Sequence, residues 1–435
     1  MSERGWVQRR EPLVVAGIIV AGIALRMLGW ISLIPRTSET WHVAVSLATT
    51  RQFADVFRPG SGPTAHVAPV MPLLIAGVYK LFGVSTPAAE WVLCLIAAVL
   101  IGVSIGFAYL LMRALGMPSR ARIAAVALCA LLPIQFAMEV RELKVWESPL
   151  AVAGLIGLLV LVVRLDTRGV RRVAETIPVL VIAGFLALLS PPVGLAGFVV
   201  IAILVVRRIA FRQWPAVAAL TIVITACFIA PWALHNRAAL GQTILTRSDP
   251  GLELAVGLND TMLNATDHRA AMNARLLEIH PITPNGYAAM QAAGGEVAYN
   301  AVLARQTSAW ISAHPEGAAI LLARHIREYF IPPPWFFSPF GTKDSPSAAI
   351  RCAYLGVTVL LAIFGMPVLI ARNRQYVYVL AAAAILVMPY LLVQPILRYR
   401  YLIYTLSVFL AVDVVAALWA RYRQRDSARR AAPIA

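Results

Sequence analysis

The stretch that decides the fold is the apolar run LVVAGIIVAGIALRMLGWISLI at residues 13–34, followed by RTSETWH at residues 36–42. The run is about as long as the ~20 residues that a helix needs to cross the hydrocarbon of a bilayer. It contains one charge, Arg26, and Arg9 and Arg10 precede it. A secretory signal would have a shorter apolar core and a small-residue cleavage site, so we expect an uncleaved membrane anchor.

The composition of the whole chain extends this conclusion. The chain has 435 residues, of which 60% are hydrophobic and only 14% are charged, and its mean hydropathy is +0.75. These values exclude an ordinary soluble protein. The four cysteines lie in or beside apolar segments and form neither a disulfide framework nor a metal-binding CxxC pair.

The apolar runs have the length of helices, which predicts an all-α, polytopic transmembrane bundle. We expect about ten spans, at Leu13–Ile34, Trp91–Met112, Ile123–Ala137, Leu150–Val163, Ile177–Leu189, Val193–Val206, Val217–Trp232, Ala353–Ile370, Tyr376–Leu392 and Tyr401–Trp419. The short run Met71–Leu81 contains Lys80 and is bracketed by prolines and a glycine, which favours a helix lying along the membrane surface.

The distribution of charge predicts the orientation. Placing the N-terminus in the cytoplasm puts 20 of the 38 Lys and Arg residues, but only five of the 21 acidic ones, in the cytoplasmic connections and the two ends of the chain. The net charge of +17 is then a topology signal that faces anionic lipid headgroups, and it does not indicate nucleic-acid binding. We expect a bacterial inner-membrane protein with both termini in the cytoplasm.

Three parts follow from this topology. Residues 1–232 form an N-terminal transmembrane module whose first outer loop, 35–90, carries candidate chemistry. Residues 233–350 form a large extracytoplasmic loop with two helical stretches, Gly294–Ala313 and Pro315–Tyr329. Residues 351–435 form the last transmembrane helices and a basic tail.

The first outer loop offers a carboxylate at the start of a helix. Ser38 or Thr37 is a good N-cap, and a helix over 39–57 would put Glu39 and His42 on one face, where the imidazole could hydrogen-bond the carboxylate. Asp55 lies about four turns further on and is a separate candidate. Two hypotheses compete at this point: Trp41 as an interfacial anchor among solvated neighbours, and Glu39 as a general base held over a membrane-bound substrate.

Several short motifs share one order along the chain. They are GPTAHVAPVMP at 62–72, ELKVWESPL at 142–150, PWALHNR at 231–237, GLEL followed by GLN at 251–259, GEVAY at 295–299, HP at 314–315 and RYRY at 398–401. Together they resemble the GT-C glycosyltransferases, in particular the family 39-like group that includes protein O-mannosyltransferases and lipid A aminoarabinose transferases. Ser38-Glu39 stands where that family has an acidic pair, and His42 where it has an aromatic residue.

The resemblance implies that the protein transfers a sugar from a polyprenyl-phosphate donor to a glycan, lipid or protein acceptor outside the cytoplasm, with inversion. Glu39 would be the base and Glu147 would orient the base or the acceptor. Basic side chains would hold the departing phosphate. The residues expected to bind substrate are His42, Asp55, His66, Arg141, Lys144, His235, Asn236, Arg237, Arg398 and Arg400.

No cofactor is expected. The seven histidines are scattered without ligand spacing, so we predict no metal site, although a hard cation held by Glu39, Glu147 and phosphate oxygens stays open. Two other functions also stay open. One is a lipid or solute transporter, which would predict inverted repeats that the sequence lacks. The other is an inactive partner subunit, because Ser38 replaces an acid of the family.

Overall fold

The computed structural model describes residues 3–340 and 346–431. Within these residues the regular elements are all helices, and the only β feature is an isolated bridge between Ala54 and Pro63, which confirms the all-α prediction. Seven helices are long and apolar enough to cross a membrane: α1 (Glu3–Gly29), α4 (Pro87–Ala114), α7 (Ser148–Arg168), α9 (Pro191–Arg208), α10 (Trp214–Leu240), α17 (Pro346–Arg372) and α20 (Tyr404–Ala431). The chain is therefore a multi-pass membrane protein.

Shorter apolar helices complete the bundle: α3 (Val70–Phe82), η2 with α8 (Val173–Thr176, Ile177–Leu189) and α18 (Tyr376–Leu392). Each of the ten predicted spans is helical over most of its length, but α8 and α18 have only 13 and 17 residues. The count of ten spans therefore stays a prediction, as does the surface position of α3.

One predicted span is broken. The segment predicted as Ile123–Ala137 forms α5 (Ser119–Leu131) and α6 (Phe136–Arg141), which meet at an angle of 58° together with the short η1 (Leu143–Val145). The break falls at Pro133, and Leu132 before it is extended, as the residue before a proline prefers. The predicted segment is helical over most of its length, but it is divided into two helices at Pro133.

Arg26 holds the broken helix together. It lies in α1 and donates to the carbonyls of Cys129 and Ala130 at the end of α5, and its Nε is 2.7 Å from Glu139 Oε2 in α6. Both side chains are almost fully buried. Charged side chains inside a membrane are costly and are almost always paired. The Arg26 guanidinium pairs with Glu139 and also donates to the free carbonyls at the end of α5, so it fixes the position of α6 relative to α5.

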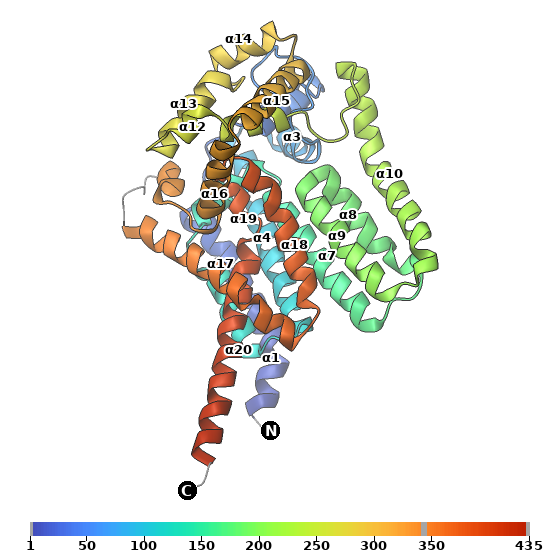
Figure 1. Ribbon diagram of the computed structural model, residues 1–435, viewed down its shortest axis with the longest axis vertical. Helices are drawn as coiled ribbons and strands as arrows, with labels where there is room; N and C mark the ends of the chain where they lie inside the picture. Colours follow the sequence, from blue (N-terminus) through green and yellow to red (C-terminus); the bar gives the residue numbers. More distant parts are fainter. Residues whose placement is uncertain (1–2, 341–345, 432–435) are drawn as a thin grey trace.

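A layer of polar helices covers one end of the bundle, opposite both termini (Figure 1). We call it the polar layer. It consists of α2 (Glu39–Thr50), α11 (Pro250–Gly257), α12 (Asp260–Leu263), α13 (His268–Ile279), α14 (Pro284–Ala292), α15 (Glu296–Ala313), α16 (Pro315–Phe330) and α19 (Leu397–Tyr401). Two 3₁₀ turns, η3 (Phe211–Gln213) and η4 (Pro334–Phe340), complete the elements. Helices α15 and α16 confirm the two helical stretches predicted in this part of the chain.

Helix α2 begins where the sequence predicts. Ser38 Oγ accepts the backbone N–H of Trp41 at 3.2 Å, which confirms Ser38 as the N-cap. The helix ends at Thr50, and not at Phe57, because Arg51 adopts a left-handed conformation with φ 64°. Residues 51–69 instead run as an irregular loop back toward α3.

We predict that Glu139→Ala destabilises the protein by about 3–5 kcal/mol, because it leaves the Arg26 guanidinium buried without its partner. Unfolding in mixed detergent micelles measures the change. The double variant Arg26→Leu/Glu139→Leu should lose less stability than Glu139→Ala alone. Glu278→Gln, which removes an exposed ion pair with Arg275, is the control and should change stability by less than about 1 kcal/mol. Equal losses for Glu139→Ala and Glu278→Gln would contradict the role given to Arg26.

A second prediction concerns orientation. Cysteine placed at Ala288, exposed on α14, should react in intact spheroplasts with a thiol reagent that cannot cross membranes. Cysteine placed at Ser427, near the end of α20, should react only after lysis. The opposite labelling pattern would overturn the orientation predicted from the positive charges.

Candidate active site

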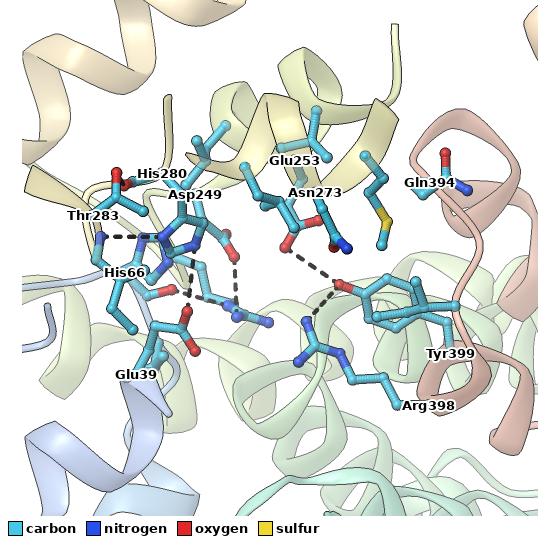
Figure 2. Close-up of a pocket in the computed structure, with 18 of the residues that line it drawn as sticks. Glu39, His66, Asp249, Glu253, Asn273, His280, Thr283, Gln394, Arg398 and Tyr399 are labelled. Atoms are coloured by element: carbon cyan, nitrogen blue, oxygen red, sulfur yellow. Dashed lines mark hydrogen bonds and ion pairs between the residues drawn. The ribbon is translucent and has the colours of Figure 1, made fainter. Parts of the chain in front are cut away.

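A cavity of about 560 Å³ lies between the polar layer and the membrane bundle. Four separate parts of the chain supply its polar groups: the first loop, the segment before α11, the end of α13 and the segment around α19 (Figure 2). The polar and charged side chains that line it are Glu39, His66, Arg247, Asp249, Glu253, Asn273, His280, Thr283, Gln394, Arg398 and Tyr399.

Glu39 is the first residue of α2, where the positive end of the helix dipole favours a carboxylate. Its Oε1 lies 3.4 Å from His280 Nε2. Burial alone would raise the pKa of Glu39, but the hydrogen bond and charge of His280, helped by His66 and Arg398, lower this pKa far below its usual range. Glu39 is therefore ionised at neutral pH.

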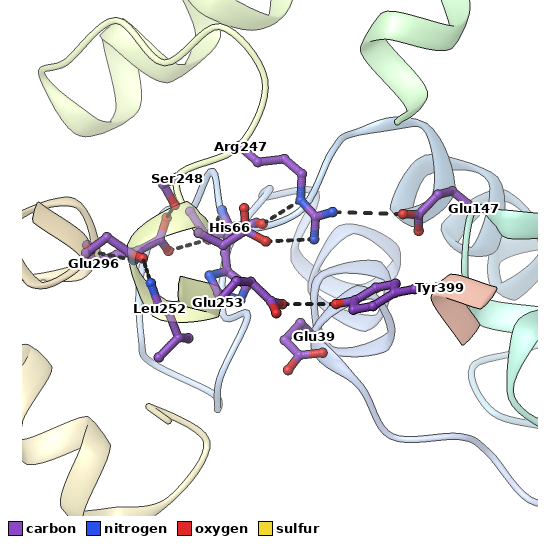
Figure 3. A network of polar contacts seen from close by, with 12 residues as sticks. Glu39, His66, Glu147, Arg247, Ser248, Leu252, Glu253, Glu296 and Tyr399 are labelled. Carbon is purple, nitrogen blue, oxygen red and sulfur yellow. Dashed lines mark hydrogen bonds and ion pairs between the residues drawn. The ribbon is translucent and has the colours of Figure 1, made fainter. Parts of the chain in front are cut away.

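His66 reaches the cavity from the irregular first loop, and buried hydrogen bonds hold that loop in place. Glu296, at the start of α15, accepts from the Thr64 hydroxyl, the Ala65 backbone N–H and the Ser248 hydroxyl (Figure 3). His66 itself is only 5% exposed, and its Nδ1 has no hydrogen-bond partner among the described residues. Burial, the largest influence, lowers the pKa of His66, so the ring is neutral at physiological pH.

Arg247 crosses the back of the cavity between two carboxylates. Its guanidinium lies 3.0 Å from Asp249 and 3.9 Å from Glu147, and its Nε donates to the carbonyl of His66 at 3.2 Å (Figure 3). Burial raises the pKa of Asp249 against the opposing effect of Arg247. Because two acids flank this cation, it serves mainly to join the first loop, the loop before α7 and the start of α11.

Arg398 is a cation without an acidic partner. No carboxylate lies within 4.0 Å of it among the residues that the structure describes, and its Nε makes no hydrogen bond there. It donates to the hydroxyl of Tyr399 at 3.0 Å and lies 4.1 Å above the ring of Trp146. Burial alone would lower the pKa of Arg398, but Tyr399 and Glu253 outweigh this effect and raise the pKa above its usual value. The guanidinium therefore stays charged.

A second cavity of about 320 Å³ adjoins the first and shares Arg398 and Trp146 with it. Its other walls combine apolar side chains, among them Trp335, Phe336 and Leu397, with the charged Arg36, Glu142 and Arg269. Arg398 therefore lies between the main cavity and this second cavity.

Of the residues that the sequence nominated, Glu39, His66 and Arg398 line the main cavity. Glu147 lies beyond Arg247, beside a small adjoining cavity that it shares with Arg398. The expected contact between His42 and Glu39 is not formed: the ring of His42 packs edge-on against Trp41, and His280 takes its place beside the carboxylate.

The other nominated residues lie outside the main cavity, and most of them make internal contacts. Lys144 is buried against Glu90 at 2.6 Å, and Arg400 donates to three backbone carbonyls. Arg141 donates to the Trp30 carbonyl, Asn236 to the Ile244 carbonyl, and Asp55 accepts from Gly62 within its own loop. His235 stacks on Trp232, and Arg237 is exposed on the same turn of α10.

Eight polar or charged residues of the cavity were missed: Arg247, Asp249, Glu253, Asn273, His280, Thr283, Gln394 and Tyr399. Glu253 and Tyr399 stood inside motifs that the sequence analysis quoted, so a signal was present. Arg247, Asp249 and His280 carry no local signature, because their role comes only from the way in which distant loops meet.

No family model and no curated protein matches the chain. Among solved structures, the chain is similar to an oligosaccharyltransferase, AglB from Archaeoglobus fulgidus, in complex with an inhibitory peptide and a dolichol-phosphate. The TM-score is 0.54 and the identity 14%; the match covers 99% of this chain and 53% of that one. The chain thus spans about half of the length of that protein.

A weaker likeness links the chain to ArnT from Cupriavidus metallidurans bound to undecaprenyl phosphate, with a TM-score of 0.39 and 13% identity, over 96% of this chain and 78% of that one. The likeness to the oligosaccharyltransferase shows the fold alone: the chain folds like that protein, in agreement with the fold that the sequence motifs implied.

Proposed function

We propose that the protein is a glycosyltransferase that moves a sugar from a polyprenyl-phosphate donor to an acceptor hydroxyl at the outer surface of a bacterial inner membrane. The main support is the position of Arg398. A partly buried guanidinium without an acidic partner binds phosphate oxygens strongly, since ionised hydrogen bonds are about twice as strong as neutral ones. The apolar side chains of the second cavity, among them Trp335, Phe336 and Leu397, suit the apolar part of a lipid donor.

The reaction we propose is a single displacement. The acceptor oxygen attacks the anomeric carbon, Glu39 takes the acceptor proton, and the bond between the sugar and the phosphate oxygen breaks. The electron pair leaves with the lipid phosphate, whose charge Arg398 stabilises. One displacement inverts the configuration at the anomeric carbon. The ionised state of Glu39 means that the acceptor always meets a carboxylate able to accept its hydrogen bond.

The comparison supports the general class of the donor. The archaeal oligosaccharyltransferase was solved with a dolichol-phosphate and an inhibitory peptide, so one protein of this fold holds a lipid phosphate and a peptide together. The main cavity of this chain would take the sugar and the acceptor, which we propose to be a glycan, a lipid or a protein.

Replacing Glu39 by Gln tests the base. The amide has nearly the same shape but cannot take the proton, so the transfer rate should fall by roughly 10²–10⁴-fold. The measurement is mass spectrometry of surface glycans and lipids in a deletion strain that carries each variant, normalised to folded protein in the membrane. Glu278→Gln is the control, because this exposed residue lies outside the cavity. Near-normal transfer by Glu39→Gln, with loss in Glu253→Gln or Asp55→Asn, would assign the base to another acid.

Replacing Arg398 by Gln tests the phosphate site without any knowledge of the sugar. Binding of undecaprenyl phosphate to the protein in nanodiscs, followed by native mass spectrometry, should weaken by about 10–150-fold, which corresponds to the 1.5–3 kcal/mol of a charged hydrogen bond. Arg398→Lys should recover part of the affinity. Arg305→Gln, an exposed arginine of α15, should bind like the unaltered protein. Equal binding by all four proteins would place the lipid phosphate elsewhere.

A further inference from the structure

Part of the wall of the main cavity has no role in the displacement described above. Glu253 lies in the first turn of α11 and Asn273 lies in α13, and both side chains line this cavity (Figure 2). The displacement assigns the lipid phosphate to Arg398 and the acceptor proton to Glu39. The donor sugar, which is the third component of the reaction, still needs a polar partner.

The direction of the displacement fixes where the sugar lies. In a single displacement the acceptor and the departing phosphate occupy opposite faces of the anomeric carbon, so the sugar ring lies between Arg398 and Glu39. Figure 2 shows these two residues on different sides of the cavity, with Glu253 and Asn273 bordering the space between them. The hydroxyl groups of the ring project away from the line of displacement, toward the cavity walls, and one of these walls carries Glu253.

A relay of two hydrogen bonds ties Glu253 to the phosphate site. Arg398 donates to the hydroxyl of Tyr399 at 3.0 Å, and this hydroxyl donates to Glu253 Oε1 at 3.3 Å (Figure 2). Tyr399 is itself held in place, because its ring stacks on Tyr390 with ring centroids 4.5 Å apart and its carbonyl accepts from the hydroxyl of Tyr329. Glu253 therefore keeps a fixed place within two hydrogen bonds of the guanidinium, where a sugar bonded to the phosphate comes within reach.

The geometry points to Glu253 as the residue that recognises the donor sugar, by accepting hydrogen bonds from its ring hydroxyls, with Asn273 as a second contact. A carboxylate offers about four acceptor sites. Tyr399 occupies one of them, and Glu253 makes no other hydrogen bond and no ion pair in the described part of the chain. The amide of Asn273 makes no hydrogen bond there either, and it can both donate and accept. This inference rests on the proposed transfer function and gives the sugar its binding site.

The charges on the cavity wall select the class of sugar. Glu39 and Glu253 line the same cavity, so an acidic sugar would bring its negative charge against two carboxylates. The sugar does not have to supply a cation either, because Tyr399 already links Glu253 to the charge of Arg398. The sugar is therefore neutral, and its hydroxyls nearest Glu253 are unmodified, since an acylated hydroxyl has no hydrogen to donate.

The geometry separates the role of Glu253 from that of Glu39. The base has to lie on the face of the sugar opposite the departing phosphate, whereas Tyr399 holds Glu253 on the phosphate side, next to Arg398. A carboxylate in that place contacts ring hydroxyls and not the attacking acceptor oxygen. The two roles are separable by experiment, since a base has to accept a proton and a sugar contact has only to accept a hydrogen bond.

The test replaces Glu253 by Gln and by Leu in the deletion strain, and mass spectrometry measures sugar transfer from the cell's own donor, normalised to folded protein. Glu253→Leu removes every acceptor and should lower transfer by about 10–150-fold, the effect of losing one charged hydrogen bond. Glu253→Gln keeps a neutral acceptor oxygen and should lose roughly 10-fold or less. Asn273→Ala should lose about 2–10-fold, and because Asn273 is exposed on α13, this variant tests the wall even if Glu253→Leu does not fold.

Binding of undecaprenyl phosphate in nanodiscs separates the sugar contact from the phosphate site, because this lipid carries no sugar. Both Glu253 variants should bind it at least as tightly as the unaltered protein, since they keep every phosphate contact and remove a negative charge. Glu278→Leu, at an exposed acid of α13 outside the cavity, is the control and should transfer sugar normally.

Three results would overturn the inference: normal transfer by Glu253→Leu, equal losses in Glu253→Gln and Glu253→Leu, or weaker binding of undecaprenyl phosphate by either Glu253 variant. The second result would make Glu253 a base, and the third would place it in the phosphate site. Failure of the proposed function looks different. Surface glycans and lipids would then not differ between the deletion strain and the strain with the unaltered gene restored, and this inference would fall with the function.

Discussion

The buried ion pair between Glu90 and Lys144 is the interaction on which the floor of the cavity depends. Its atoms are 2.6 Å apart and neither side chain is exposed. Lys144 also donates to the carbonyls of Ser32 and Ile34 after α1, and Tyr79 of α3 donates to Glu90. One pair thus joins α1, α3, α4 and the loop that carries Trp146 and Glu147. Breaking such a pair by removing one partner costs about 3–5 kcal/mol, because the remaining charge is left buried.

Much of the fold could be predicted from the sequence, because the membrane imposes simple rules on it. Apolar runs had to be helical, because a helix satisfies its own backbone hydrogen bonds inside the membrane. The sequence was less informative about where a helix is interrupted or ends. Pro133 divides one span, and Arg51 ends α2 early through a left-handed turn. Both events depend on the backbone conformation of a single residue, which the helical pattern around it does not reveal.

The candidate site was predictable only where a motif marked it. Glu39, His66 and Arg398 stood in quoted motifs, and all three line the cavity. Basic residues such as Lys144 and Arg400 stood in motifs too, yet they serve the packing of the bundle, because a buried cation needs partners wherever it lies. His280 lies 241 residues after Glu39 along the chain. No local spacing can announce such a contact, which explains why the histidines looked scattered.

The central claim is that one cavity holds a lipid phosphate at Arg398 and an acceptor beside Glu39. A cryo-electron microscopy structure of the protein in nanodiscs containing undecaprenyl phosphate tests it most directly. The account predicts phosphate density at the Arg398 guanidinium, with the polyprenyl chain leaving past Trp335 and Phe336. Phosphate density at the end of the bundle that carries both termini, or a lipid phosphate bound only to exposed arginines, would contradict it.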